Sequence, residues 1–375
     1  MNILYEDSMP YAEHFLNGLG NAKSFSTGSL GEDDLRNIDV LLVRSTTKVN
    51  KTLLQKAKQL KYVATATAGS DHLDKTFLAS IGLPWGSAAG CNAIAVAEYV
   101  LSCLMAQFQE NLDELRNKTV GIVGAGHVGT ALATRLKVLG IETKLCDPPL
   151  QEQGDLRPFY DLDEICQCDV ISLHVPFVRE GKFATGHLFD ANRLSMLKDH
   201  QILINACRGE VVDNAAAKVR LGQANAPHML FDVWESEPDI DFQLVPLTDV
   251  ATAHIAGHSL EGKARGTYML YQQICERFGY QQTLDFQSCL PVAPALSLPD
   301  AAKQSDLEQI YTAIMSTYNV TNDSRLFKDT VKTGSDFVYS RKHYAIRREF
   351  ASVPLNAGNF SVSEALYELG FGAVK

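Results

Sequence analysis

Short apolar runs alternate with stretches of helical spacing along nearly the whole chain. In the first part, apolar runs predict strands at residues 1–6, 39–45, 61–67 and, more weakly, 83–88. A second and cleaner series predicts strands at residues 119–124, 142–147, 169–175, 201–207, 229–234 and 249–254. Amphipathic stretches such as KTLLQKAKQL, residues 51–60, lie between the strands. This alternation is typical of α/β proteins, in which crossover helices cover a parallel sheet.

Two long apolar stretches of helical spacing divide the chain. The first covers residues 91–115, separates the two series of strands and suits a helix packed between two domains. The second covers residues 254–278 and follows the last strand of the second series. Beyond it, a boundary is marked by Pro291, Pro294 and Pro299. The remainder, from roughly residue 300 to the end, indicates a small α+β unit.

The composition argues against several classes of protein. The 375 residues are 46% hydrophobic and 21% charged, which is typical of a soluble chain long enough for two or three domains. A net charge of −10 argues against a broad electrostatic contact with nucleic acid or an acidic membrane. The N-terminal residues match neither a signal nor a transit peptide, so we expect a cytoplasmic protein. The eight cysteines lie in apolar segments without metal-ligand spacing, and we expect no metal site.

A glycine-rich turn follows the strand predicted at residues 119–124. GAGHVG places Gly124, Gly126 and Gly129 in GxGxxG spacing before an Ala/Leu-patterned helix. In this context the glycines permit a tight turn, the approach of a pyrophosphate to the backbone, and close packing of helix on strand. Asp147, at the end of ETKLCD, suits ribose hydroxyls and disfavours a 2′-phosphate, so NAD is expected rather than NADP. The alternative is a glycine turn that binds no dinucleotide.

Three polar residues follow apolar strands in the second half of the chain: Arg208 after ILINAC, Glu237 after MLFDVW, and His254 after DVATA. If these strands are neighbours in one sheet, the three side chains converge where a nicotinamide ring would lie. An arginine suits a carboxylate, and a histidine oriented by a carboxylate suits proton exchange near neutral pH. The set predicts oxidation of a 2-hydroxy acid. The alternatives are an Arg208 that pairs with a structural acid such as Asp213, and a histidine that is an ordinary core or surface residue.

At these residues the sequence resembles the D-isomer-specific 2-hydroxyacid dehydrogenases. NACRGEVVD, DVWESEP and HIAGHS are similar to the family's arginine, glutamate and histidine motifs, and GAGHVG and TAGSDHLD accompany them in the family's order. The resemblance implies that Arg208 binds and polarises the substrate, that His254 is the acid/base, and that Glu237 is its partner.

The resemblance also implies a domain organisation. It predicts two Rossmann-like, doubly wound parallel-sheet domains: a substrate domain of residues 1–92 with 255–290, and an NAD-binding domain of residues 93–254. A small C-terminal α+β dimerisation domain of residues 291–375 completes the expected fold, and the active enzyme is expected to be a homodimer.

Binding roles for further residues follow from the same resemblance. Besides the glycines and Asp147, the cofactor-binding positions are His127, Val128, Val175, Cys207, Asp232 and Gly257, with Asp232 on the nicotinamide carboxamide. The substrate-binding positions are Arg44, Ser45, Thr67, Gly69, Ser70 and His258. Two of these positions depart from the family, because His258 stands where tyrosine is expected and Val175 where threonine is frequent.

Four stretches narrow the resemblance to one branch of the family: RSTTKVN, CDPP, INACRGEVVDN and HIAGHSLEGKARGT. They are similar to a branch of the family that oxidises 4-phospho-D-erythronate with NAD on one bacterial route to pyridoxal phosphate. The arginine, hydroxyls and lysine of RSTTKVN, residues 44–50, suit a phosphate, and a solvated loop is the alternative. A further hypothesis is that Arg347 and Arg348 supply additional positive charge to that phosphate. Competing functions are oxidation of 3-phosphoglycerate within the same family and a non-catalytic NAD-sensing scaffold.

Overall fold

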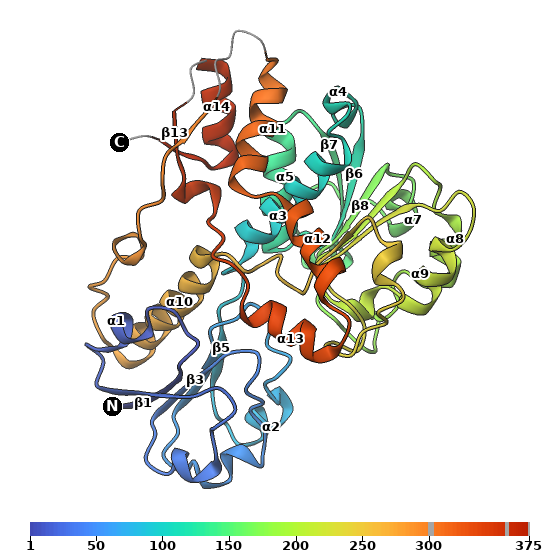
Figure 1. Ribbon diagram of the computed structural model, residues 1–375. Coiled ribbons are helices and arrows are strands. Elements are labelled where there is room, and N and C mark those ends of the chain that lie inside the picture. The colour runs from blue at the N-terminus through green and yellow to red at the C-terminus, as the bar shows by residue number, and fades with distance from the viewer. Residues whose placement is uncertain (299–303, 357–359, 374–375) are drawn as a thin grey trace. The chain divides into compact units, whose positions relative to one another are not determined.

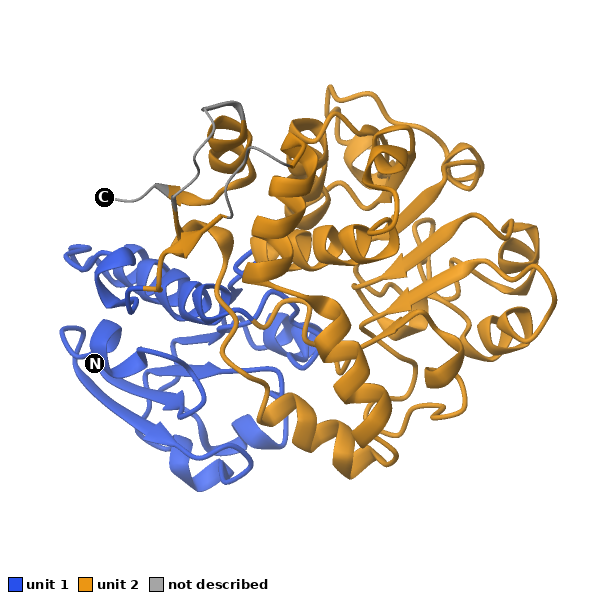
Figure 2. Ribbon diagram, turned by 45° about the horizontal axis from the view of Figure 1, so that its top comes forward, with its two compact units in different colours: residues 1–92, 259–292 blue, residues 93–258, 293–375 orange. Residues whose placement is uncertain are grey.

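The computed structural model describes residues 1–298, 304–356 and 360–373, which fold into two compact units (Figure 2). Unit 1 consists of Met1–Asn92 and Ser259–Val292, and unit 2 of Ala93–His258 and Ala293–Lys375. The C-terminal residues therefore belong to unit 2, and their expected role in dimerisation stays a prediction. Pro299, one of the prolines that mark the predicted boundary, lies outside the described residues.

Unit 1 contains a five-stranded parallel sheet in the order β2-β1-β3-β4-β5. Its strands are β1 (Asn2–Glu6), β2 (Asn21–Phe25), β3 (Val40–Val43), β4 (Tyr62–Thr65) and β5 (Trp85–Ser87). Its helices are α1 (Ala12–Leu16), α2 (Lys75–Ser80), α10 (Leu260–Phe278), and the 3₁₀ helices η1 (Glu32–Leu35), η2 (Leu53–Lys56) and η5 (Gln287–Cys289). Alternate strand residues enter two cores: Ile3 and Leu42 pack with α1 and α10, whereas Leu4 and Leu41 pack with α2 and η1. The sheet is doubly wound, as expected.

Two segments of unit 1 differ from the prediction. KTLLQKAKQL forms only the short 3₁₀ helix η2, in which Leu54 is the buried residue, because one buried side chain does not make the continuous apolar stripe that a longer helix needs. The edge strand β2, NAKSF, was not predicted. Its side chains are exposed or half-buried, so the segment lacks the apolar run that identifies an interior strand.

Unit 2 contains a six-stranded parallel sheet in the order β11-β10-β9-β8-β6-β7. Its strands are β6 (Thr119–Val123), β7 (Glu142–Cys146), β8 (Val170–Leu173), β9 (Ile202–Asn205), β10 (His228–Phe231) and β11 (Val250–Ala251). The chain passes from β6 to β7 on one side and then crosses to β8 on the other, so the strand order reverses between β6 and β8. Ligands of open α/β sheets bind at such a point, beyond the carboxyl ends of the strands.

The helices of unit 2 connect these strands. They are α3 (Ala93–Gln107), α4 (Leu112–Arg116), α5 (His127–Val138), α6 (Pro148–Glu152), α7 (Leu162–Ile165), α8 (Ala191–Met196), α9 (Asn214–Leu221), η3 (Gly209–Val211) and η4 (Val245–Leu247). The single helix predicted at residues 91–115 is divided into α3 and α4, because the exposed polar residues 109–111 lie in the turn between them. The second predicted long helix is α10, which begins after its N-cap Ser259 rather than at residue 254.

The C-terminal segment packs against this sheet through helices (Figure 1). Its elements are β12 (Leu296–Ser297), α11 (Asp306–Thr317), α12 (Val320–Thr330), α13 (Gly334–Lys342), η7 (Phe350–Ser352), β13 (Pro354–Asn356), α14 (Phe360–Leu369) and β14 (Gly372–Ala373). The strands β12, β13 and β14 form a small parallel sheet. Helices α11 and α12 lie against α3, α14 lies beside α5, and α12 lies along β11.

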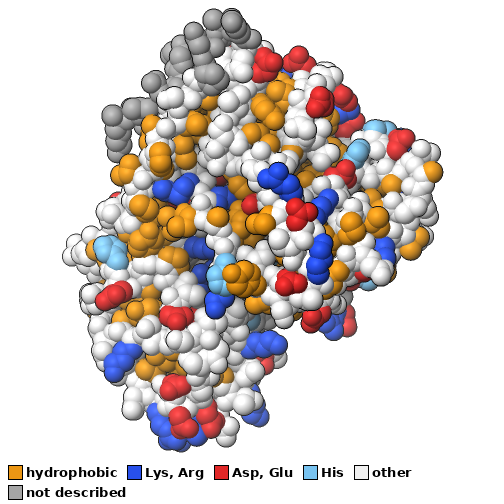
Figure 3. Space-filling view, in the orientation of Figure 1, with side chains coloured by type: hydrophobic (Ala, Val, Ile, Leu, Met, Phe, Trp, Pro, Cys, Tyr) orange, Lys and Arg blue, Asp and Glu red, His pale blue; other side chains and the backbone are white. Residues whose placement is uncertain are grey.

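The surface is mixed in charge. On the face drawn in Figure 3, acidic and basic side chains both occur, with apolar side chains between them. Within the described residues, no helix combines the length and the apolar character needed to cross a membrane.

Candidate active site

Arg208, Glu237 and His254 follow three neighbouring strands of unit 2. β9, β10 and β11 are adjacent and parallel, so the segments that carry the three residues leave the same edge of the sheet. The condition on which the sequence argument depended, that these strands are neighbours, is therefore met.

His254 and Glu237 form a hydrogen-bonded pair. The distance from His254 Nδ1 to Glu237 Oε2 is 2.8 Å, and the side chains are 30% and 19% exposed. The backbone N–H of Trp234 donates to Glu237 Oε1 at 2.9 Å. Burial raises the pKa of Glu237, but His254 and these hydrogen bonds outweigh burial, so the pKa lies below its ordinary value. An ionised carboxylate only accepts, so Nδ1 carries the proton in the neutral imidazole and Nε2 is the atom that can take one.

The loop of His254 is held by Asp232, directly after β10. This carboxylate, 1% exposed, accepts hydrogen bonds from the backbone N–H groups of Ile255 at 2.7 Å and Ala256 at 2.9 Å. It also accepts from Thr252 Oγ1 at 2.7 Å, and Tyr99 then donates its hydroxyl proton to Thr252 at 2.8 Å. The resemblance placed Asp232 on the nicotinamide carboxamide, which stays a prediction. In the described residues its carboxylate orders the backbone beside His254.

A tight turn positions Arg208. Asn205 donates from its side-chain nitrogen to the Arg208 carbonyl at 2.9 Å and accepts from the Cys207 N–H at 3.2 Å. The Arg208 guanidinium donates to the Cys207 carbonyl at 2.7 Å. A Cβ at Gly209 would lie 2.0 Å from the backbone of Trp234, so only glycine allows this turn to approach the loop that leads to Glu237.

The glycine turn after β6 has the form that the motif predicts. Gly124 has φ of +94°, and a Cβ there would lie 2.5 Å from the His174 carbonyl oxygen. A Cβ at Gly129 would lie 2.0 Å from the Gly124 carbonyl oxygen, so helix α5 packs directly on the turn. Gly126 is exposed, and a Cβ there would meet no atom within 4 Å. The space beside Gly126, at the N-terminus of the twelve-residue helix α5, fits the pyrophosphate of a dinucleotide.

Asp147 lies where the sequence placed the ribose acid, directly after β7. Its Oδ2 accepts from the Ala125 N–H at 2.8 Å, and its Oδ1 accepts from the Leu150 N–H at 3.0 Å at the start of α6. The residue therefore links the glycine turn to α6, and each oxygen keeps a second lone pair for another donor.

The other predicted cofactor residues border the same edge of the sheet. His127 is exposed and Val128 half-buried in the first turn of α5, Val175 is half-buried after β8, and Gly257 is half-buried in the loop after His254. Cys207 is 8% exposed, and burial raises the pKa of its thiol to about 11, so it is not a thiolate at neutral pH.

In unit 1, the predicted substrate loop is organised by Glu6, the last residue of β1. Its carboxylate, 1% exposed, accepts from the Arg44 N–H at 2.9 Å. It also accepts from four hydroxyl groups, those of Ser8, Thr27, Thr46 and Thr47. Burial raises the pKa of Glu6, but the hydrogen bonds from the Arg44 N–H and from the hydroxyls of Thr47, Ser8 and Thr27 outweigh it, so the pKa lies below its ordinary value.

Two hydroxyl groups of the loop are bound to Glu6. Thr46 and Thr47 donate their hydroxyl protons to this carboxylate and would have to rotate away from it to donate to a phosphate, so phosphate binding by the loop stays a prediction. Ser45 is exposed, and the Arg44 guanidinium donates to the Ser8 carbonyl at 2.7 Å.

A chain of hydrogen bonds shapes the second substrate loop, after β4. Thr67 donates to the Gly69 carbonyl at 2.8 Å, so Thr65 donates to Thr67 at 2.7 Å and His72 Nε2 donates to Thr65 at 2.9 Å. Gly69 and Ser70 are half-buried at the end of this chain.

His258 and Arg347 lie in unit 2. The His258 ring meets the edge of Tyr344, with 6.2 Å between ring centroids. Arg347 is 5% exposed and donates to the backbone carbonyls of Ala95 and Ala256. The hypothesis that Arg347 offers its charge to a phosphate is therefore wrong, because its guanidinium is buried against backbone oxygens of its own unit.

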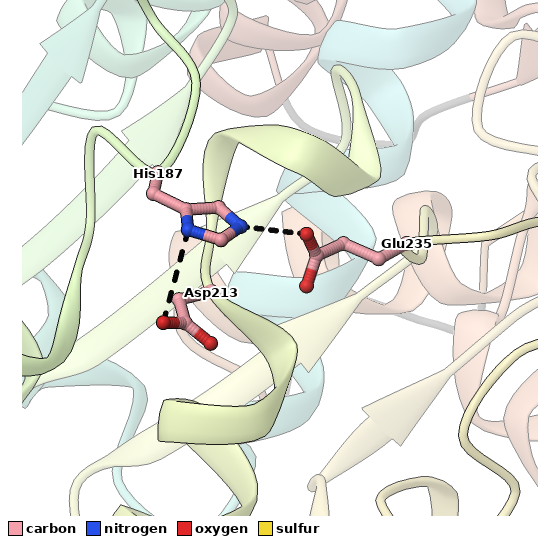
Figure 4. Close-up of side chains that lie close together, drawn as sticks. All are labelled: His187, Asp213 and Glu235. Carbon is pink, nitrogen blue, oxygen red and sulfur yellow. Dashed lines mark hydrogen bonds and ion pairs between the residues drawn. The ribbon is translucent and has the colours of Figure 1, made fainter.

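Figure 4 shows a histidine, His187, between two acids, Asp213 and Glu235. His187 Nε2 is 2.7 Å from Glu235 Oε1, and its Nδ1 is 3.8 Å from Asp213 Oδ2. The hydrogen bond with Glu235 raises the pKa of His187. These three side chains are close enough to be considered as metal ligands. However, the other carboxylate oxygens accept from the N–H groups of Asn214 and Ala216, and each ring nitrogen faces a carboxylate, so the cluster ties the loop after β8 to the loop after β10.

Sequence reasoning missed Glu6, Asn205 and Thr252, which orient the predicted residues. One signal was present for Glu6, because an acid ends the apolar run MNILYE. Asn205 and Thr252 lie inside apolar runs as single polar residues, and no local pattern distinguishes a buried organising residue from an ordinary strand residue.

Comparisons with known proteins agree with this geometry. Residues 97–256 match the D-isomer specific 2-hydroxyacid dehydrogenase, NAD binding domain, and residues 290–370 match a domain of unknown function, DUF3410. The chain is 53% identical to the erythronate-4-phosphate dehydrogenase of Pseudoalteromonas atlantica and 44% identical to that of Tolumonas auensis, with 99% of both chains covered in each case.

Solved structures of similar fold include two dehydrogenases. The D-lactate dehydrogenase of Aquifex aeolicus, complexed with NAD and lactic acid, has a TM-score of 0.60 at 22% identity, over 75% of this chain and 96% of that one. The NAD-bound 3-phosphoglycerate dehydrogenase of Entamoeba histolytica has a TM-score of 0.61 at 21% identity, over 74% of this chain and 95% of that one. At these identities the likeness shows the fold alone.

Proposed function

The chain belongs to the D-isomer specific 2-hydroxyacid dehydrogenase family, and from that membership we propose that it oxidises 4-phospho-D-erythronate with NAD to (R)-3-hydroxy-2-oxo-4-phosphobutanoate. Two full-length relatives named erythronate-4-phosphate dehydrogenase support this substrate. The observation in the molecule that carries the proposal is the 2.8 Å pair of His254 and Glu237, on the strand order that also places Arg208 at the same edge. This reaction belongs to a route to pyridoxal phosphate.

The roles of the residues follow from their chemistry. Arg208 binds the substrate carboxylate with its planar guanidinium and polarises the oxygen at C2. His254 Nε2 takes the proton of the C2 hydroxyl, while Glu237 keeps the ring oriented and stabilises the imidazolium. NAD, bound at the glycine turn, supplies the hydride acceptor, so C2 becomes a carbonyl and NADH and one proton are formed. The Glu6-held loop and the turn at Gly69 bind the rest of the substrate.

Two further expectations belong to the same proposal. We infer a homodimer, with the C-terminal segment contributing to its interface, and a cytoplasmic location. Oxidation of 3-phosphoglycerate and a non-catalytic NAD-binding role are the competing functions, and the names of the two relatives favour neither.

The decisive experiment measures NADH formation by its near-ultraviolet absorbance. Purified protein is offered 4-phospho-D-erythronate, 3-phosphoglycerate or D-lactate, with and without a 2-oxo acid that reoxidises bound cofactor. We expect turnover with the first substrate, and a loss of roughly 10²–10⁴-fold in kcat for His254→Asn with NAD affinity kept. Preference for 3-phosphoglycerate would overturn the substrate assignment. No turnover with any substrate, together with normal NAD binding, would support the non-catalytic role.

A further inference from the structure

The C-terminal segment forms hydrogen bonds with backbone groups at the edge of the six-stranded sheet of unit 2. β11 is the last strand of that sheet, and the backbone N–H of Ala251 donates to Ser324 Oγ of α12 at 3.0 Å in a buried position. Lys328, one turn further along α12, donates to the carbonyls of Thr248 and Asp249. The edge groups of the strand that leads to His254 are therefore bound by α12.

The same segment holds the loop that carries Glu237. The Trp234 ring stacks on Phe327 of α12, with 6.0 Å between centroids and 15° between planes. Trp234 in turn donates its backbone N–H to Glu237 and its indole N–H to the Thr252 carbonyl. At the start of α13, a Cβ on Gly334 would lie 2.2 Å from Asp239 Oδ1, so this helix also packs closely on the loop.

Arg347 reaches the loop on the other side of His254. Its guanidinium donates to the Ala256 carbonyl at 3.0 Å and to the Ala95 carbonyl, and it lies 3.9 Å from the Tyr318 ring centroid. Glu98 and Glu349 are buried near it, and burial raises the pKa of Glu98 to about 8. A buried guanidinium is costly unless it is hydrogen-bonded, and the two bonds from its terminal nitrogens to Ala95 and Ala256 fix its position.

These contacts converge on a strained residue. His254 has φ of +57°, a left-handed conformation that is unfavourable for a non-glycine residue and persists only where its surroundings impose it. Ala256, two residues later, is held at its N–H by Asp232 and at its carbonyl by Arg347. Ala251, three residues earlier, is held by Ser324.

We propose that residues 304–356 of the C-terminal segment are a positioning element of the active site in their own chain, with Arg347 and Ser324 fixing the backbone on either side of His254. This inference rests on the proposed role of His254 and assigns a task to a region whose matching domain has no known function. It does not depend on whether the segment also forms a dimer interface, because each contact lies within one chain.

The test replaces single residues in the full-length protein. Arg347→Met keeps most of the side-chain volume but removes both hydrogen-bond donors. Arg347→Lys keeps the positive charge and can donate to one of the two carbonyls. Arg325→Met changes an exposed arginine of α12 and is the matched control. Three properties are measured: amide hydrogen exchange of residues 250–258, kcat and KM with NAD and substrate, and assembly state by light scattering.

For Arg347→Met we expect at least about tenfold faster exchange in residues 250–258 and a roughly tenfold lower kcat, with KM for NAD and assembly unchanged. Arg347→Lys should recover part of the kcat, and Arg325→Met should match the wild type. Two results for Arg347→Met would overturn the proposal. One is amide exchange in residues 250–258 that equals that of the wild type. The other is exchange that is faster by the same factor over all of unit 2, together with a wild-type kcat measured below the melting temperature.

Two further results keep the test decisive. If Arg347→Met does not fold, Ser324→Ala removes only the acceptor for Ala251, and we expect faster exchange of that amide with little other change. If the wild type does not oxidise 4-phospho-D-erythronate, the proposed function fails, but the exchange measurement still decides whether the segment holds this loop.

Discussion

Glu6 in unit 1 and Asp232 in unit 2 are both 1% exposed carboxylates that end or directly follow a parallel strand, and both bind the loop that follows a neighbouring strand. They differ in the donors that they accept. Glu6 accepts from four side-chain hydroxyls and one backbone N–H, whereas Asp232 accepts from two consecutive backbone N–H groups and one hydroxyl. Hydroxyls can rotate to another acceptor, but a backbone N–H moves only with the chain.

Because their donors differ, the two carboxylates stabilise different parts of their loops. Asp232 determines the path of the chain at Ile255 and Ala256, and therefore the backbone angles of His254. Glu6 binds side chains of three segments, at Ser8, Thr27 and Thr46–Thr47, and holds the backbone of the substrate loop at Arg44. We therefore expect a change at Asp232 to impair the chemical step and a change at Glu6 to impair substrate binding.

The largest expected effect comes from Asp232→Asn. The amide has one acceptor where the carboxylate has two, and its NH₂ group would face a backbone donor, so kcat should fall by about 10²-fold or more and stability by about 3 kcal/mol. Steady-state kinetics and urea unfolding measure both. Asp163→Asn, at an exposed acid of α7, is the control. A kcat within twofold of wild type would show that Asp232 does not set the geometry of His254.

A smaller and different effect is expected from Glu6→Gln. One face of the amide still accepts, but the other repels donors, so we expect KM for the phosphorylated substrate to rise about tenfold while kcat and KM for NAD stay within about twofold. Glu13→Gln, at an exposed position of α1, is the matched control. If kcat falls as far as it does for Asp232→Asn, Glu6 affects the chemical step as much as Asp232 does, and its proposed role in substrate binding alone is wrong.

Thr252→Val separates the effect of the hydroxyl donor of Asp232 from that of its two backbone donors. The valine removes the one hydroxyl donor of Asp232 and leaves the Tyr99 hydroxyl without its acceptor, but it keeps both backbone donors. We expect a loss of about 1–2 kcal/mol in stability and less than about fivefold in kcat, since one hydrogen bond of this kind contributes about that much. Tyr99→Phe should cost less, because it removes a donor and leaves Thr252 bound to Asp232. A kcat loss equal to that of Asp232→Asn would mean that the hydroxyl, rather than the backbone donors, carries the effect.

The smallest effect is a dependence on pH. The folded pKa of Glu6 lies below its ordinary value of 4.5, so its carboxylate stabilises the fold fully above that value and loses the contribution as pH falls through the folded pKa. The difference in free energy of unfolding between wild type and Glu6→Gln should be constant from about pH 6 to 8 and shrink below pH 4.5. Urea unfolding at several pH values measures it, and a difference that is independent of pH down to 3 would contradict the assigned ionisation.

Sequence patterns predicted the parallel α/β architecture, the glycine turn, and Arg208, Glu237 and His254 as strand-end residues, since strand periodicity and chain order fix which end of a strand a residue occupies. Local patterns failed where burial is not periodic, as in the exposed edge strand β2 and the short helix η2. The contacts of Glu6 with the loop at Arg44 and of Arg347 with Ala256 became evident only in the folded chain, because these partners are far apart in the sequence. Such contacts depend on which buried donors meet which acceptors after the sheets form, and a buried polar group reveals its partner only once the surrounding chain is in place.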